Sequence, residues 1–254
     1  MNWRVIVWGA ALTVLTAALP VAAEVPPGDL PAAEFLRLAA YRSTMQDSFA
    51  RLTGKVSHLR RNTGGAEYYR IDFRILFYPG RMDGEVLLDG RELYRISRRV
   101  GTGIAVTSAG LPAPPREPLL KHLGIEVGDL AMGFLDLPFR SEEPRERVKT
   151  VECRVLRLAR PDGGSVKVWI SREHLFPIRA QFFSPGARES EKPVRTLEIT
   201  GFREINGYYV VTDLAVLGRE YRTRIEFDVR KVGRNTAAEA KEVFAPEAAQ
   251  AQGK

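Results

Sequence analysis

The chain has 254 residues, of which 44% are hydrophobic and 27% are charged, a globular balance that excludes a mainly disordered protein and suffices for one domain. The formal net charge is +7, and Cys153, the single cysteine, excludes an internal disulfide framework and a cysteine-based zinc site. The histidines His58, His122 and His174 lie far apart in the sequence and argue against a histidine metal cluster. We therefore expect no metal and no other cofactor.

Residues 1–23 have the pattern of an export signal. Arg4 precedes an apolar stretch over residues 5–19, which Pro20 and a small-residue triplet at 21–23 follow. We expect cleavage after Ala23 and an exported mature chain. The alternative is a retained membrane anchor, because residues 5–23 could nearly span a bilayer. In an oxidising compartment the lone Cys153 is expected to be a buried small hydrophobe and not a reactive thiol.

The mature chain is expected to begin with helices. After a Pro/Gly linker over Glu24–Asp29, the pattern predicts a helix that starts near Pro31, and the apolar spacing around Phe35 gives it one apolar face. We expect Tyr41–Leu52 to continue this helix or to form a second one, which ends at Gly54.

From Gly54 onward the hydrophobic period becomes two. Glu67–Tyr78 is the clearest strand, because its odd positions from Tyr69 to Phe77 are all large and apolar while charges fill the other face. Further strands are separated by turns rich in Asp-Gly and Asn-Gly pairs: Glu85–Leu88, Glu92–Ser97, Thr150–Leu158, Ser165–Ser171, Pro177–Ser184, Val194–Phe202, Tyr208–Leu217 and Arg222–Val229. The fold class is therefore α+β, mainly antiparallel β, with a strongly curved sheet that forms a barrel or an open barrel.

Two segments interrupt the strands. Ser108–Pro118 carries four prolines and should hold no regular element. Leu119–Leu135 is expected to form one or two short apolar helices. A short terminal helix is expected over Ala237–Phe244, and residues 247–254 should form a disordered tail.

No signature of catalysis is present, so we expect no enzyme and no catalytic residues. The chain has no G-x-S-x-G, P-loop or H-E-x-x-H motif, and Gly101-Thr102-Gly103 lacks the third glycine of a dinucleotide fingerprint. A carboxylate group of Asp136, Glu142 and Glu143 is expected in a polar loop as solvated charges, while His58 and His174 are expected to be structural or exposed.

The excess of arginine raises the question of nucleic acid. The pairs Arg60-Arg61 and Arg98-Arg99 could contact phosphates, but arginine and glutamate alternate through the whole chain, which favours solvated strand faces. We expect no nucleic-acid partner. A weak, transient contact with anionic membrane headgroups is the alternative for this charge.

Short phrases in a fixed order resemble the LolA-like outer-membrane lipoprotein-sorting proteins of diderm bacteria. They occur at 49–56, 89–94 (DGRELY), 151–156, 168–171 with 176–180, and 243–246. The resemblance covers Ala32 to Pro246 and implies a half-open barrel over residues 24–246, with helices over its concave face. It also implies a periplasmic carrier that takes the acyl chains of lipoproteins from an inner-membrane donor to an outer-membrane acceptor.

The best-known carriers gate their cavity with an Arg just before a Pro and a Phe three residues after it. The matching positions here flank Pro79 and hold Tyr78 and Met82. Met82 is thus an apolar substitute for the Phe, whereas Tyr78 does not replace the positive charge of the Arg. The departure is typical of a divergent branch of these proteins.

An antiparallel sheet this curved has a concave face that could hold an apolar ligand. The lining is predicted from the strand pattern and the resemblance to be Tyr69, Ile71, Phe73, Ile75, Phe77, Met82, Val86, Leu88 and Trp169, and the lid to be Leu130, Met132 and Phe134. An error of one residue in register would exchange the two faces of a strand. Two other functions stay open: a sensor of envelope stress that binds lipoprotein, and a structural, partner-binding β protein whose barrel is filled.

Overall fold

A computed structural model describes residues 26–42, 44–61, 64–109, 118–188 and 191–244. The expected signal segment and the expected tail lie outside these residues. The helices are η1 (Pro27–Asp29), α1 (Ala32–Arg42), α2 (Leu119–His122), α3 (Val127–Leu130), η2 (Gly133–Asp136) and α4 (Ala237–Val243). None of these helices has the length and apolar character needed to cross a membrane.

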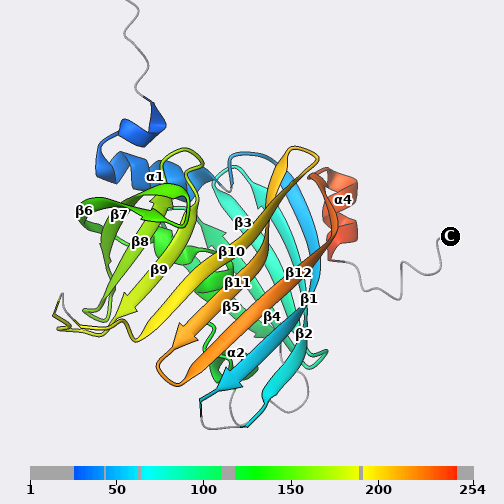
Figure 1. Cartoon of the computed structure of the whole chain (residues 1–254). Coiled ribbons are helices and arrows are strands. Elements are labelled where there is room, and N and C mark those ends of the chain that lie inside the picture. Colours follow the sequence, from blue (N-terminus) through cyan, green and yellow to red (C-terminus); the bar gives the residue numbers. More distant parts are fainter. Residues whose placement is uncertain (1–25, 43, 62–63, 110–117, 189–190, 245–254) are drawn as a thin grey trace, which may run out of the picture.

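All strands belong to one antiparallel sheet. They are β1 (Ser48–Arg60), β2 (Ala66–Tyr78), β3 (Arg81–Leu88), β4 (Glu92–Arg99), β5 (Gly103–Ala109), β6 (Phe139–Val148), β7 (Val151–Ala159), β8 (Ser165–Ser171), β9 (Pro177–Phe183), β10 (Arg195–Ile205), β11 (Tyr208–Gly218) and β12 (Tyr221–Arg234). The 12 strands follow the order β5-β4-β3-β2-β1-β12-β11-β10-β9-β8-β7-β6, so β5 and β6 are the two edges. The sheet is curved and does not close, which confirms the predicted half-open barrel (Figure 1).

The concave face of the sheet is covered by helices. We call α1 together with the segment from α2 to η2 (residues 119–136) the helical cover. In Figure 1 the α2–η2 segment (green) lies within the curve of the sheet. Phe35 of α1, Leu123 after α2 and Phe134 of η2 are buried in one cluster with inward side chains of most strands. The cover and the concave face therefore form a single hydrophobic core.

The convex face carries two smaller clusters. Helix α4 packs Val243 against Phe49 of β1 and Leu76 of β2. Farther along the sheet, Trp169 of β8 packs with Cys153 of β7 and Ile178 of β9. Both clusters lie outside the core that the helical cover shares with the sheet.

Several expectations about local structure were wrong. Only Tyr41 and Arg42 of Tyr41–Leu52 continue the first helix, because α1 ends at Arg42 and β1 begins at Ser48. Strand β1 pairs with β2 on one side and β12 on the other, and these distant partners override the local pattern. The polar segment around Glu142 and Glu143 is not a loop but the edge strand β6. The strand β5 was not predicted either, and it includes Ser108 and Ala109, which were expected to lie outside any regular element.

Gly54, expected to end a helix, lies in the middle of β1. A Cβ here would clash with the carbonyl oxygen of Glu226 and would lie 3.1 Å from side-chain carbons of Ile71 and Phe227. We expect Gly54→Ala to lower the free energy of unfolding by about 1–3 kcal/mol in urea denaturation. Gly65→Ala is the control, because a Cβ there meets no atom within 4 Å. Equal effects of the two substitutions would contradict this account of Gly54.

Candidate functional site

Most of the predicted lining residues do lie together on the concave face. Strand β2 places its odd positions inward, and β3 places its even positions beside them. Buried in the common core are Ile71, Phe73, Ile75, Met82, Val86 and Leu88. Tyr69 and Phe77 are half-buried and pack against the same core. Whether these side chains contact a ligand stays a prediction.

Trp169 does not join them. Its neighbours Val168 and Ile170 point into the concave core, so the alternation of β8 turns Trp169 to the convex face. There its indole Nε1 donates a hydrogen bond to Glu146 Oε2 of β6 at 2.9 Å. We therefore leave Trp169 out of the proposed lining.

The predicted lid residues belong to the helical cover. Phe134 is buried, whereas Leu130 and Met132 are half-buried and pack against the core. Met132 has φ 52° at the junction between α3 and η2, a left-handed conformation that turns the chain sharply there.

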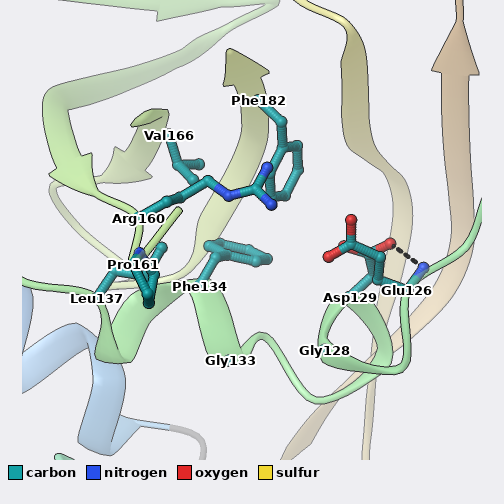
Figure 2. Close-up of a pocket in the computed structure, with 10 residues that line it drawn as sticks. All are labelled: Glu126, Gly128, Asp129, Gly133, Phe134, Leu137, Arg160, Pro161, Val166 and Phe182. Carbon is teal, nitrogen blue, oxygen red and sulfur yellow. Dashed lines mark hydrogen bonds between the residues drawn. The ribbon is translucent and has the colours of Figure 1, made fainter. Parts of the chain in front are cut away.

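A pocket of about 170 Å³ lies beside Phe134 (Figure 2). Its apolar wall consists of Phe134, Leu137, Pro161, Val166 and Phe182, and the rings of Phe134 and Phe182 meet edge to face at 6.2 Å. Figure 2 shows the Arg160 side chain along one side and the Glu126 and Asp129 carboxylates on the other. The pocket is smaller than the roughly 300 Å³ at which small-ligand sites begin, so it could enlarge only if the helical cover moves.

Inward-facing arginines of the sheet hold the helical cover in place. The guanidinium of Arg98 on β4 donates from Nε to Asp136 Oδ2 at 2.6 Å and from Nη2 to Asp136 Oδ1 at 3.1 Å. Its Nη2 also lies 3.4 Å from the carbonyl oxygen of Ala40 in α1. The side chains are 1% exposed for Arg98 and 4% for Asp136, so this ion pair is dry and joins η2 and α1 to the sheet.

Arg154 on β7 holds the start of α1. It donates to both carboxylate oxygens of Glu142 at 2.7 and 2.8 Å and to the carbonyl oxygen of Leu30 at 2.5 Å. Its guanidinium lies 4.5 Å from the ring centroid of Phe35. The edge strand β6 and the first turn of α1 are therefore fixed by one side chain.

Arg195 on β10 holds α3 beside the pocket. Its Nη1 donates to Asp129 Oδ2, which also accepts the backbone N–H of Glu126 at 2.9 Å in a capping box. Burial raises the pKa of Asp129 to about 6 against the opposing pull of Arg195. The guanidinium stacks 3.9 Å from the ring centroid of Phe182, which forms the pocket wall.

Helix α2 is held at its start by an acceptor from the sheet. Both oxygens of Glu92 accept the backbone N–H of Leu119, at 3.0 and 2.8 Å. The hydroxyl of Tyr94 donates to the same carboxylate. Burial, and then this hydrogen bond, raise the pKa of the Tyr94 phenol above its ordinary value, so the hydroxyl stays a donor at neutral pH.

The three carboxylates that were expected to be solvated are in fact ion-paired. Asp136 binds Arg98, Glu142 binds Arg154, and Glu143 lies 2.6 Å from Arg157 Nη2 and 2.8 Å from Lys167 Nζ. These bonds to cations lower the pKa of Glu142 and outweigh desolvation to lower the pKa of Glu143. Sequence reasoning missed the arginines because it treated charged residues in strands as surface residues.

In the part of the chain that the structure describes, side chains placed to bind a metal or to act as a nucleophile are otherwise few. Among the described residues no group of three or more His, Cys, Asp or Glu is placed to hold a metal ion. Cys153 is fully buried, and burial raises the pKa of its thiol to about 11, as suits a small hydrophobe.

Comparisons with known proteins relate the fold to solved structures. No protein-family model and no curated protein matches the chain. A DUF1329 family protein from Desulfovibrio piger has a TM-score of 0.57 at 13% identity, with 81% of this chain and 93% of that chain covered.

Two further structures carry more informative descriptions. One is a putative outer membrane lipoprotein-sorting protein domain from Vibrio parahaemolyticus (TM-score 0.53, 14% identity, 82% and 95% covered). The other is a LolA superfamily protein from Nitrosomonas europaea (TM-score 0.53, 17% identity, 84% and 97% covered). The chain therefore has the fold of these proteins, and the predicted LolA-like resemblance is confirmed at the level of the fold.

Proposed function

We propose that this protein is a periplasmic carrier that binds the acyl chains of lipoproteins, or of related lipids, on the concave face of its half-barrel. A donor at the inner membrane would load it, and an acceptor at the outer membrane would receive the cargo. Residues 1–23 would direct export and be removed. The binding surface would consist of the inward residues of β2 and β3, with Phe134, Leu130 and Met132 as the lid.

One observation carries the proposal: the apolar concave face is covered by helices that a few arginine contacts attach to it. Arg98 and Arg195 bind carboxylates of the cover, and Arg154 packs against Phe35 of α1. Detaching the cover breaks these contacts, the hydrogen bonds of Glu92 and Thr223 to residues 119–123 and the packing in the common core, but it leaves the hydrogen-bonded sheet intact. A cover of this kind can exchange its own apolar side chains for those of a guest.

The energetics of such an exchange are favourable enough for transport. Each buried methylene contributes about 0.8 kcal/mol, so a chain of roughly ten methylenes contributes on the order of 8 kcal/mol. That gain offsets the loss of cover contacts in the loaded state. Closed and open forms can then be close in energy, and a partner shifts the balance at loading and release. Carriage of this kind needs no catalytic step.

The proposal predicts that the purified protein holds lipid. Native mass spectrometry and organic extraction should find acyl lipids bound, and a fluorescent fatty acid should bind the delipidated protein with saturation. In cells, depletion should leave lipoproteins at the inner membrane. An empty extract together with no probe binding would contradict carriage. A change of transcription without stranded lipoproteins would favour a sensor.

A further inference from the structure

A polar network lies beneath α2 at one end of the half-barrel. In the sheet register, His58 of β1 faces Glu67 of β2 on one side and Thr223 of β12 on the other. Arg60 lies two residues farther along β1. Helix α2 adds His122, whose ring centroid lies 5.1 Å from that of His58. The network therefore joins the helical cover to three neighbouring strands.

The hydrogen bonds fix the protonation state of His58. The hydroxyl of Thr223 donates its proton to the carbonyl oxygen of Leu123 at 2.5 Å. Its oxygen must then accept the proton of His58 Nδ1, at 2.8 Å. This leaves Nε2 of a neutral ring as an acceptor, and Arg60 Nε donates to it at 3.4 Å.

The same reasoning applies to His122. An ionised Glu67 only accepts, so His122 Nε2 donates to its Oε2 at 2.7 Å, and the hydroxyl of Tyr69 donates to the same oxygen at 2.6 Å. The remaining His122 Nδ1 accepts from Arg60 Nη2 at 3.1 Å. Arg60 therefore donates to both imidazoles, which requires both of them to be neutral.

We propose that this network is an acid-sensitive clasp, which holds α2 against the barrel at neutral pH and releases it when the buried His58 takes up a proton. A proton on His58 replaces its Nε2 lone pair with an N–H and places a positive charge against the Arg60 guanidinium in a buried site. Water can solvate this charge when α2 moves away, so the protonated ring favours the open form. Movement of α2 uncovers Leu120 and Leu123, which it keeps buried over the concave face. The inference rests on the proposed function for its consequence, which is ligand exchange at this end of the barrel.

The direction of the pH effect follows from the surroundings of His58. Burial, and then the charges of His122 and Arg60, lower its pKa below 6.5, while Glu67 opposes them. The unfolded chain therefore binds this proton more readily than the folded protein does. The stability that the site contributes is present above pH 6.5 and is lost as the pH falls through the lowered pKa.

The two phenols and the carboxylate around the clasp keep their charge states in this range. Burial is the first cause that raises the pKa of the phenols of Tyr69, to about 12, and of Tyr221, whose ring lies 5.7 Å from that of His58. Hydrogen bonds from Tyr69 and His122 lower the pKa of Glu67, so it stays ionised. The titratable and charged groups that face the pair are Arg60 from β1, Glu67 and Tyr69 from β2, and Tyr221 from β12, and Lys121 precedes His122 in α2.

Hydrogen–deuterium exchange of the ligand-free protein tests the clasp. After correction for intrinsic rates, residues 119–125 should exchange about tenfold faster at pH 5.0 than at pH 7.5, a change of about 1.4 kcal/mol in opening. The double variant His58→Gln/His122→Gln should lose this response, because glutamine keeps a donor and an acceptor and does not titrate. His174→Gln is the matched control, since the chain has only these three histidines and His174 lies on the exposed turn after β8.

An unchanged rate in the wild type, or an undiminished response in the double variant, would overturn the clasp. If the double variant is unstable at pH 7.5, His58→Asn alone carries the test by the same criterion, because the asparagine amide does not titrate and can take the place of His58 Nδ1 as the donor to Thr223. Protonation of Asp129 acts on α3, which is followed in a separate peptide. The measurement uses no ligand, so a negative result would contradict the clasp but not the proposed lipid binding, which is tested separately at pH 7.5.

Discussion

Replacing Arg98 by alanine should lower the free energy of unfolding by about 3–5 kcal/mol, the usual cost of removing one partner of a buried ion pair. Within the described part of the chain, the buried Asp136 carboxylate would keep one hydrogen bond, from the backbone N–H of Gly101 at 3.2 Å. The carbonyl oxygen of Ala40 would lose the same guanidinium. Urea denaturation followed by circular dichroism measures the global loss, and hydrogen exchange should accelerate first in residues 32–42 and 133–136.

Arg95→Ala on the same strand is the matched control. Arg95 is 58% exposed and pairs with Glu85 on the convex side at 2.8 Å, so its loss should change stability by less than about 1 kcal/mol. A similar loss in both variants would show that Arg98 acts as an ordinary surface charge. The double variant Arg98→Met/Asp136→Leu should regain most of the stability, because an apolar pair of similar volume replaces a costly dry ion pair.

The sequence predicted the concave face well wherever one face of a strand was apolar and the other charged. Strand β2 is the clearest case, since Ile71, Phe73 and Ile75 alternate with charged residues and all three are buried in the core. In β8 the same rule could not tell which side chains face the concave side, because Val168, Trp169 and Ile170 are all apolar and all buried. Only the packing partners on each side of the sheet distinguish the two faces there.

Arg98 shows a signal that was available and was missed. It follows Tyr94 and Ile96 in the inward phase of β4, and it pairs across the sheet with Met82. An arginine in phase with core residues predicts a buried partner, although the sequence alone does not say which carboxylate supplies it.

The strands β1 and β6 could not be predicted from local pattern. Strand β1 is defined by its two neighbours, and its glycine at position 54 reflects close backbone packing and not a helix end. Strand β6 is an edge that is exposed over most of its length, so its charged residues and Pro144 show no alternation. How far the helical cover fills the concave face also depends on packing between elements that are distant in sequence.

The second large effect, on both stability and fatty-acid affinity, is expected from a substitution in the lid. Phe134→Ala should cost about 3–5 kcal/mol of unfolding free energy in the ligand-free protein, because the ring is buried against Phe182 and its removal enlarges the pocket. The enlarged pocket should accept an acyl chain with less movement of the cover. A fatty acid should therefore bind the variant more tightly than the wild type and restore part of the stability, about 2.7 kcal/mol at a ligand concentration of 100 times Kd.

Phe49→Ala separates this effect from a general loss of packing. Phe49 is as well buried as Phe134, at 3% and 6% exposed, but it lies on the convex face under α4. Its removal should cost a similar free energy of unfolding, while fatty-acid affinity stays at the wild-type value. Thermal denaturation with and without ligand, combined with fluorescence titration, compares the three proteins. If ligand binds all three equally, the space beneath Phe134 is not where the acyl chain goes, and the lid assigned to η2 would have to be abandoned.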